Sequence, residues 1–233
     1  MFKQLFDEVS STLTYLIADD ESKEAIIIDP VKALLDTYLT LVKQNDLTLK
    51  YALETHVHAD HVTASGRLKQ RLGLQTGLSE QCGAAEADLQ LNENDVITFG
   101  QQKITVIATP GHTAGSLSFL WKDRIFTGDT LLINGCGRTD FQGGDASVLY
   151  GSIMQKIFSL PDETLIYPGH DYQGRRVSSV MQEKLINPRL AHKSHAEFVA
   201  IMNALNLPKP QLIDLAVPAN RKCGLDEADV LQG

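Results

Sequence analysis

The segment 56–61 constrains this chain more than any other feature of its sequence. It reads His-Val-His-Ala-Asp-His, so four side chains that can bind a metal ion fall within six residues. The apolar run 51–53, which predicts a strand, comes shortly before it. With seven His in 233 residues, such a cluster arises by chance with a probability on the order of 10⁻⁴ to 10⁻³. The segment therefore predicts a metal site at the end of a strand and disfavours a set of unrelated surface histidines.

Three further potential ligands also follow predicted strands. They are His112 in Thr-Pro-Gly-His, Asp129 in Thr-Gly-Asp and His170 in Tyr-Pro-Gly-His, each with a Gly directly before it. Glycine permits the tight backbone turn that brings a side chain from a strand end into a shared cleft. Because four strand ends each deliver a ligand type, we expect them to converge on one metal site.

Strand and helix patterns alternate along most of the chain, and the central strands follow one another without helices between them. This combination predicts an α/β layered sandwich in one domain, with sheets inside and helices outside. The expected strands are 12–18, 25–28, 51–53, 96–99, 104–108, 116–121, 125–127 and 165–167. The expected helices are 33–44, 63–72, 148–159, 177–185 and 194–205, the last with Ser194 as its N-cap and Glu197 three residues on.

The composition is that of a globular protein with an acidic surface. Lys and Arg total 21 against 29 Asp and Glu, a net charge of −8, which argues against a nucleic-acid partner. No apolar run approaches the ~20 residues that span a bilayer, and the first residues lack the pattern of a secretion signal. Cys82, Cys136 and Cys223 are odd in number and far apart, so we expect reduced thiols and a cytoplasmic location.

The spacing His-x-His-x-Asp-His followed by Gly-His, Gly-Asp and Gly-His resembles that of the metallo-β-lactamase superfamily. The resemblance implies a four-layer αββα sandwich with its metals at the sheet edges. It does not decide the activity, because members include β-lactam hydrolases, thioesterases, nucleases and oxidoreductases. The usual chemistry is hydrolysis by two metal ions, and a glyoxalase II-like thioesterase (hydroxyacylglutathione hydrolase) is one alternative. Its two ions would be held by His56, His58 and His112, and by Asp60, His61 and His170, with Asp129 bridging them.

Three segments resemble another branch, the persulfide dioxygenases, which are also called ethylmalonic-encephalopathy-protein-like sulfur dioxygenases. The first is Gly-Cys-Gly-Arg-Thr-Asp-Phe-Gln at 135–142, and the second is Gly-His-Asp-Tyr at 169–172. The third is a C-terminal series with Asn-Pro-Arg at 187–189, Asn-Leu-Pro-Lys-Pro at 206–210 and Ala-Val-Pro-Ala-Asn at 216–220, followed by Cys223-Gly224. The chain would then be one domain over 1–233, with a short family-specific extension from about 187.

This resemblance implies a mononuclear non-haem iron enzyme. One Fe(II) per chain would be held by His56, His112 and Asp129, and such a set leaves three positions open for substrate and O₂. The remaining candidates would orient these ligands or hold a second metal; they are His58, Asp60, His61 and His170. The implied reaction converts glutathione persulfide, O₂ and water into glutathione and sulfite, without an organic cofactor.

The same resemblance suggests residues that contact the substrate. Arg138, Tyr172 and Arg189 match family positions associated with the thiol, and Arg pairs well with the carboxylates of glutathione. A structural salt bridge is the alternative role for either arginine, and we interpret Cys136 as a packing residue. The family also suggests a homodimer. A non-catalytic sulfur-sensing module is disfavoured, because no ligand position has been lost.

Overall fold

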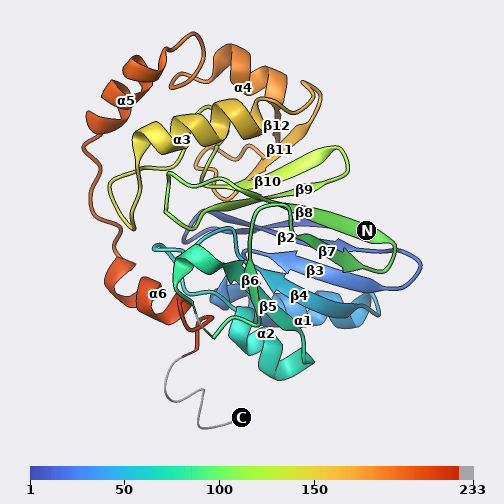
Figure 1. Cartoon of the computed structure of the whole chain (residues 1–233). Helices are drawn as coiled ribbons and strands as arrows, with labels where there is room; N and C mark the ends of the chain where they lie inside the picture. The colour runs from blue at the N-terminus through green and yellow to red at the C-terminus, as the bar shows by residue number, and fades with distance from the viewer. Residues whose placement is uncertain (85, 226–233) are drawn as a thin grey trace. The chain divides into compact units, whose positions relative to one another are not determined.

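The computed structural model describes residues 1–84 and 86–225, which form two compact units. Unit 1 contains residues 1–91 and 97–103 together with the chain from Lys209 onward, and unit 2 contains residues 92–96 and 104–208. Figure 1 traces the chain from one unit to the other by colour. The expected extension from about 187 is thus divided, because its first part belongs to unit 2 and its last part to unit 1. A single domain over 1–233 stays a prediction.

Unit 1 is built on a six-stranded mixed sheet in the order β1-β2-β3-β4-β5-β6. The pairs among the first three strands are antiparallel, and those from β3 to β6 are parallel. Parallel neighbours need crossover connections, which here contain α1 (Leu35–Gln44, after a 3₁₀ turn at Lys32–Leu34), α2 (Ser65–Leu72) and a 3₁₀ turn at Glu80–Cys82. The strands are β1 (Phe2–Asp7), β2 (Thr12–Ala18), β3 (Glu24–Ile28), β4 (Thr48–Leu53), β5 (Gln75–Ser79) and β6 (Leu89–Leu91).

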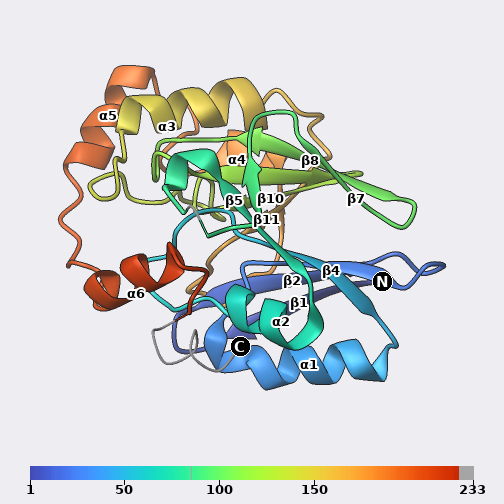
Figure 2. The ribbon, with the colours of Figure 1, turned by 60° about the horizontal axis from the view of Figure 1, so that its bottom comes forward.

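Helices α1 and α2 lie on one face of this sheet, as Figure 2 shows, and apolar side chains pack between the helices and the strands. Tyr38 and Val42 of α1 and Leu68 of α2 are buried together with strand residues such as Ile27 and Ala52. Because β3 and β4 are parallel, their carboxyl ends lie at the same edge of the sheet, which is the usual place for a site in such folds. The chain leaves this edge directly into the predicted metal-binding segment.

The second sheet has the order β12-β11-β10-β9-β8-β7, and all of it except residues 97–103 lies in unit 2. Pairs β8–β9, β9–β10 and β11–β12 are antiparallel, and β10–β11 is parallel with an irregularity near Gly128. The strands are β7 (Val96–Phe99), β8 (Gln102–Ala108), β9 (Leu117–Trp121), β10 (Arg124–Gly128), β11 (Leu165–Pro168) and β12 (Ser178–Ser179).

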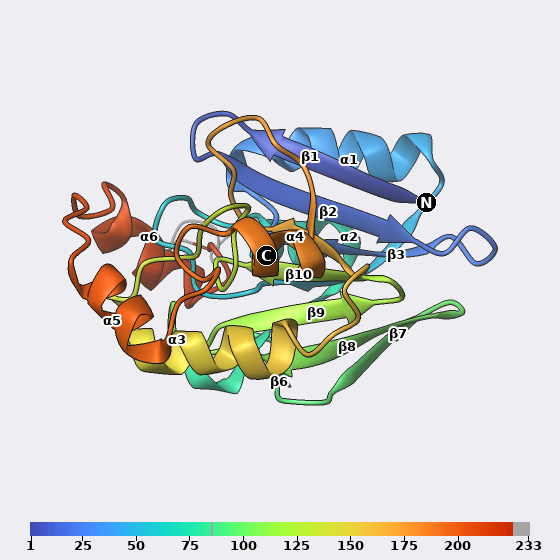
Figure 3. The ribbon, with the colours of Figure 1, turned by 90° about the horizontal axis from the view of Figure 1, so that it is seen from above.

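Three helices share one hydrophobic core with this second sheet. They are α3 (Ala146–Ser152, continued by a π-helical turn at Ile153–Ile157), α4 (Val180–Ile186) and α5 (His195–Asn203). Leu149 and Phe198 are fully buried together with Ile125 and Ile166 of the strands, and α3 and α5 lie side by side (Figure 3). Each unit thus contributes a sheet with helices on it, as the layered α/β prediction requires.

The structure confirms the predicted strands and most of the helices, including the capping box formed by Ser194 and Glu197. The helix expected over 177–185 is wrong at its start, because Ser178 and Ser179 pair with β11 before α4 begins. Two serines carry no apolar alternation, so backbone pairing decides their conformation. Besides β12, the sequence did not predict β1, β5, β6 or α6 (Ile213–Asn220), which is a unit 1 helix with Pro218 inside it. Within the described part of the chain, no helix is long and apolar enough to cross a bilayer.

Candidate metal centre

The segment 56–61 forms a loop directly after β4, and its three histidines are buried. Buried polar groups must find partners in the protein, and in this loop most of the partners are side chains of unit 1. The loop begins with Glu54 and Thr55, two further polar residues that are also buried. The contacts of these two residues explain how each histidine is oriented.

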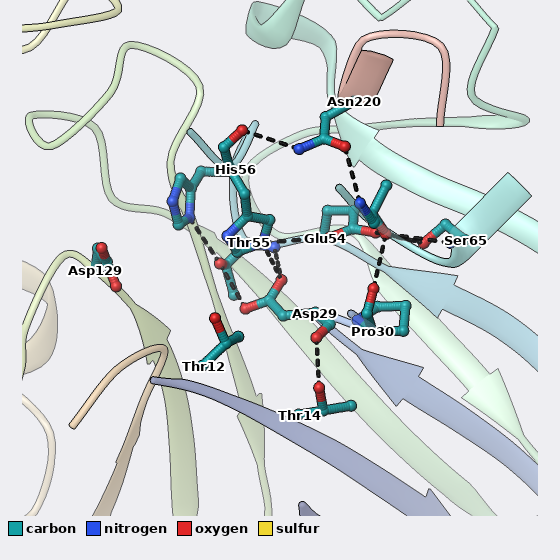
Figure 4. A network of polar contacts seen from close by, with 12 residues as sticks. Thr12, Thr14, Asp29, Pro30, Glu54, Thr55, His56, Ser65, Asp129 and Asn220 are labelled. Carbon is teal, nitrogen blue, oxygen red and sulfur yellow. Dashed lines mark hydrogen bonds and ion pairs between the residues drawn. The ribbon is translucent and has the colours of Figure 1, made fainter. Parts of the chain in front are cut away.

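A relay of hydrogen bonds selects the tautomer of His56 (Figure 4). Asp29, at the end of β3, accepts hydrogen bonds from the backbone N–H of Thr55 at 2.7 Å and from its hydroxyl at 2.8 Å. The Thr55 hydroxyl oxygen is 3.0 Å from Nδ1 of His56. Because the hydroxyl hydrogen goes to the carboxylate, this oxygen accepts the Nδ1–H of His56. The relay leaves Nε2 of His56 unprotonated, which is the state that a metal ligand requires.

His58 is oriented differently, because its Nε2 faces two buried carboxylates. The nitrogen is 3.1 Å from Oδ1 of Asp29 and 3.3 Å from Oε2 of Glu54. Neither contact has the geometry of a hydrogen bond, and this nitrogen has no hydrogen-bond partner among the described residues. The other oxygen of Glu54 accepts the hydroxyls of Thr63 and Ser65. Burial acts to lower the pKa of His58, but the two nearby carboxylates outweigh it, so the pKa lies well above its ordinary value. His58 is therefore paired inside unit 1.

His61, at the end of the loop, is held by polar contacts at one ring nitrogen. Nδ1 of His61 is 2.9 Å from Oδ2 of Asp60 and 3.3 Å from the hydroxyl of Thr12. Its Nε2 is buried and has no hydrogen-bond partner among the described residues. Ligand atoms of His58, Asp60 and His61 lie within 4.8 Å of one another, as do those of Asp29, Glu54 and His58. A metal ion or an ordered water molecule is what usually satisfies such a nitrogen.

In unit 2, His112 and Asp129 present ligand atoms to one another. Nδ1 of His112 is 2.7 Å from the backbone carbonyl oxygen of Arg138; a carbonyl only accepts, so the proton is on Nδ1 and Nε2 carries the lone pair. That Nε2 is 3.7 Å from Oδ2 of Asp129, which is too long for a hydrogen bond. Two ligands each about 2.1 Å from one ion are separated by at most about 4.2 Å. The separation therefore suits two ligands of a shared ion.

The other oxygen of Asp129 is used inside unit 2. Nδ1 of His170 is 2.6 Å from Oδ1 of Asp129, and His170 is buried. His170 thus orients the carboxylate and leaves Oδ2 on the side of His112. This is the arrangement in which a histidine supports a ligand.

Two glycines allow the backbone to approach these ligands. A Cβ on Gly137 would lie 2.6 Å from Nδ1 of His112 and would collide with the carbonyl oxygen of Asp129. A Cβ on Gly169 would lie 2.8 Å from Oδ1 of Asp129. Real Cβ atoms do not approach other atoms so closely, so only glycine fits at either position.

The predicted substrate residue Arg138 makes contacts within unit 2. Its Nε and Nη2 each donate to a carboxylate oxygen of Asp140 at 2.6 Å, and Nη1 donates to the carbonyl of Pro208 at 2.7 Å. Nη2 also donates to the carbonyl of Leu207 at 3.2 Å. The alternative role considered for this residue, a structural salt bridge, is thus present in the structure.

Arg189 supports the segment 135–142, which also contains Arg138. Its Nη1 donates to the carbonyl of Cys136 at 2.7 Å. Cys136 is buried, and burial raises the pKa of its thiol above the ordinary value although Arg189 acts to lower it. Tyr172 is 72% exposed and stacks on the ring of His170 at 6.1 Å between centroids. Of the three predicted substrate residues, Tyr172 is the one with most of its surface accessible.

Sequence reasoning missed the residues that hold the loop in unit 1. They are Asp29, Glu54, Thr55 and Asn220, and each hydrogen-bonds to the loop or to its flanks. Asp29 had one available signal, since an acidic residue directly after a predicted strand is placed at the same sheet edge as the histidines. The others are ordinary polar residues until the fold brings them together.

Comparison with known proteins identifies the class that this fold and these residues define. The profile of the metallo-β-lactamase superfamily matches residues 7–81 and 79–170. The chain belongs to this superfamily, so the predicted α/β sandwich of the metallo-β-lactamase fold is confirmed as its fold class, and its His and Asp residues are those of a metal-binding site.

Within the superfamily, the chain belongs to the persulfide dioxygenase family. It is 51% identical over 228 residues to the mitochondrial persulfide dioxygenase ETHE1 of Homo sapiens, covering 97% of this chain and 89% of that protein. The crystal structure of ETHE1 from Myxococcus xanthus matches with a TM-score of 0.95 and 54% identity, over 97% of this chain and all of that one. A hydroxyacylglutathione hydrolase of Brucella anthropi is 33% identical over 210 residues, covering 88% of this chain and 78% of the hydrolase.

Proposed function

We propose that this chain is a sulfur dioxygenase that oxidises glutathione persulfide with O₂ and water to glutathione and sulfite. The observation that carries the proposal is the similarity to persulfide dioxygenases, which runs through nearly the whole chain at about half identity. The hydroxyacylglutathione hydrolase is less similar over a shorter stretch. The reaction balances without another reagent: the outer sulfur gives up four electrons, O₂ accepts them, water supplies the third oxygen of sulfite, and two protons are released.

We further propose that one Fe(II) is held by His56, His112 and Asp129, the family's ligand positions. The donor chemistry fits this metal, because two neutral imidazoles and a carboxylate are the set typical of non-haem iron enzymes that use O₂. Hydrogen bonds at Nδ1 of both histidines leave Nε2 unprotonated, and His170 occupies one oxygen of Asp129. When bound, the iron supplies open coordination positions at which a persulfide sulfur and O₂ can meet.

The surroundings of His58 limit how this residue could bind a second ion. In a binuclear hydrolase this histidine would bind the same ion as His56. Here its Nε2 lies beside the carboxylates of Asp29 and Glu54, inside unit 1. The carboxylates therefore occupy one ring nitrogen, and a second ion could reach His58 only through Nδ1, which is buried and has no hydrogen-bond partner among the described residues. Asp60, His61 and His170 are then residues that orient ligands, which is the role that His170 already has toward Asp129.

We propose that Tyr172, Arg138 and Arg189 shape the place where the thiol binds. The exposed ring of Tyr172 can contact an arriving substrate directly. Arg138 can bind a carboxylate of glutathione only if that group replaces Asp140 as the partner of its guanidinium. Arg189 acts through the loop that it supports at Cys136.

A cytoplasmic location is also a proposal. It is supported by Cys82, Cys136 and Cys223, which are all free and buried, because free thiols are typical of reducing compartments. The expected homodimer, the absence of a nucleic-acid partner and the absence of a membrane partner stay predictions.

Oxygen-electrode measurements on iron-loaded protein test the proposed function. We expect O₂ uptake only when glutathione persulfide is present, with one sulfite and one glutathione formed per O₂ consumed. The matched control is S-lactoylglutathione, whose hydrolysis should be negligible under the same conditions. Efficient thioester hydrolysis without O₂ uptake would assign the chain to the hydroxyacylglutathione hydrolases instead.

A further inference from the structure

The end of α6 brings one buried amide to the metal-binding loop. Asn220 is 2% exposed, and its Nδ2 donates to the carbonyl oxygens of His58 at 2.9 Å and His61 at 2.8 Å. Its Oδ1 accepts the backbone N–H of Thr63 at 2.9 Å. Figure 4 shows this amide beside the loop. One side chain therefore satisfies three backbone groups of the segment that carries the metal-site histidines.

The chemistry of these contacts requires asparagine. Both hydrogens of the amide nitrogen are donated and the amide oxygen accepts, so donors and acceptor are used together. Aspartate would lose both donors and place a negative charge beside two carbonyl oxygens. Buried backbone groups without partners are costly, so the loop would have to change its conformation if the amide were removed. Asn220 thus fixes the backbone from which His58 and His61 project.

The segment that follows Asn220 packs against the same part of unit 1. The carbonyl of Cys223 accepts the backbone N–H of Gly66 at 2.8 Å, and a Cβ on Gly66 would lie 2.7 Å from that carbonyl oxygen. Gly224 has φ +77° and lies so close to the carbonyl of Thr63 that no Cβ fits. Cys223 is buried with Val57 of the loop. These contacts hold α6 in place independently of the amide.

We propose that Asn220 is a positioning residue of the metal centre: the C-terminal segment 216–224 sets the conformation of loop 56–61, and through it the affinity and ligand geometry of the bound metal. The role rests on the proposed function only in that the metal is taken to be iron. The Ala-Val-Pro-Ala-Asn and Cys-Gly motifs then each have a physical role. The first ends α6 with the amide at the loop, and the second packs the chain after α6 against the backbone of Thr63 and Gly66.

Metal binding measured without turnover tests this role. Asn220→Ala and Asn220→Asp are compared with the wild type by competition for Fe(II) with a chelator, and by the EPR spectrum of the nitric oxide complex, which reports ligand geometry. We expect a ten- to hundredfold loss of iron affinity, the usual effect of removing a group that orients metal ligands, together with an altered spectrum. Asn203→Ala, at an exposed position in α5, is the matched control and should leave both unchanged.

Asn220→Asp keeps the shape of the side chain and the acceptor for the N–H of Thr63. It is therefore the variant in which metal affinity is measured if Asn220→Ala does not fold. An affinity within twofold of the wild type and an unchanged spectrum in a folded Asn220 variant would overturn the proposal. Failure of the proposed function is distinguishable, because it would appear in the wild type as absent O₂ uptake and would leave the comparison of metal affinities intact.

Discussion

The two units hold their potential ligands by different means. In unit 1 the histidines share one loop, and side chains orient them: Asp29 acts through Thr55, Glu54 faces His58, and Asn220 binds the backbone. In unit 2 the ligands come from three separate strand ends, after β8, β10 and β11. There the backbone does most of this work, through the carbonyl of Arg138 and the close approach of two glycines.

This difference determines which substitutions the potential ligands of each unit tolerate. A side-chain partner in unit 1 can be removed singly, and the loss should be graded according to how many of its contacts remain. In unit 2, replacing a side chain leaves the backbone carbonyl in place, whereas adding a single Cβ to a glycine displaces a ligand. We therefore expect polar substitutions to matter most in unit 1 and glycine substitutions to matter most in unit 2.

The ligands themselves should show the largest effects in either unit. His56→Ala, His112→Ala and Asp129→Ala should each abolish bound iron and O₂ uptake, because a two-ligand site holds Fe(II) weakly. His61→Ala and His170→Ala should retain appreciable iron, because the proposed ligand set does not include these residues. Metal analysis of anaerobically purified variants provides the measurement. Two zinc ions per chain in active wild-type protein would refute this assignment.

Gly137→Ala tests the backbone-supported half. The added Cβ would lie 2.6 Å from Nδ1 of His112, and overpacking of this kind costs roughly 1–3 kcal/mol, or up to about 150-fold in iron affinity. Gly151→Ala is the control, because its Cβ meets nothing within 4 Å and it lies inside α3. That change should stabilise the protein by about 0.5–1 kcal/mol. Equal iron affinity in the two variants would show that the glycine is not needed.

Thr55→Val tests the side-chain-supported half. Valine keeps the shape and the backbone hydrogen bond to Asp29 but removes the hydroxyl that fixes the tautomer of His56. We expect about tenfold weaker iron binding, at the lower end of the range for such groups. Thr55→Ser keeps the hydroxyl and should bind iron like the wild type. If serine and valine behave alike in a chelator competition, the relay does not set the affinity.

Arg138→Ala should have the smallest effect on the metal, because His112 is bound by the backbone carbonyl at this position. We expect iron affinity within a few-fold of the wild type. The free energy of unfolding should fall by about 1–2 kcal/mol for the lost hydrogen bonds to Asp140 and Pro208. Denaturant unfolding and chelator competition measure the two quantities. A higher KM for glutathione persulfide at unchanged kcat would assign the side chain a substrate contact as well.

The potential ligands can be picked out in the sequence because each leaves a local pattern, and their roles stay predictions. Closely spaced histidines after an apolar run, and a glycine before each later ligand, can be recognised within a few residues. The supporting groups leave no such pattern. Glu54 reads as an ordinary polar residue, and Asn220 lies more than 150 positions from the carbonyl groups that it binds. The short strand β6 and the helix that contains Pro218 were not predicted for a related reason. Tertiary contacts determine these elements, and hydrophobic periodicity does not.

The position of Asn220 in the chain has a consequence for the order in which the protein is made. Thr63 and Asn220 are 157 residues apart, and at about 5–20 residues per second the ribosome needs roughly 8–30 s to pass from one to the other. All of unit 2 from Ile104 to Pro208 is synthesised in that interval. Until it ends, the amide that later binds the loop carbonyls has not yet been made. A metal ion that arrives early in translation therefore meets a looser set of histidines than one that arrives after α6 has docked.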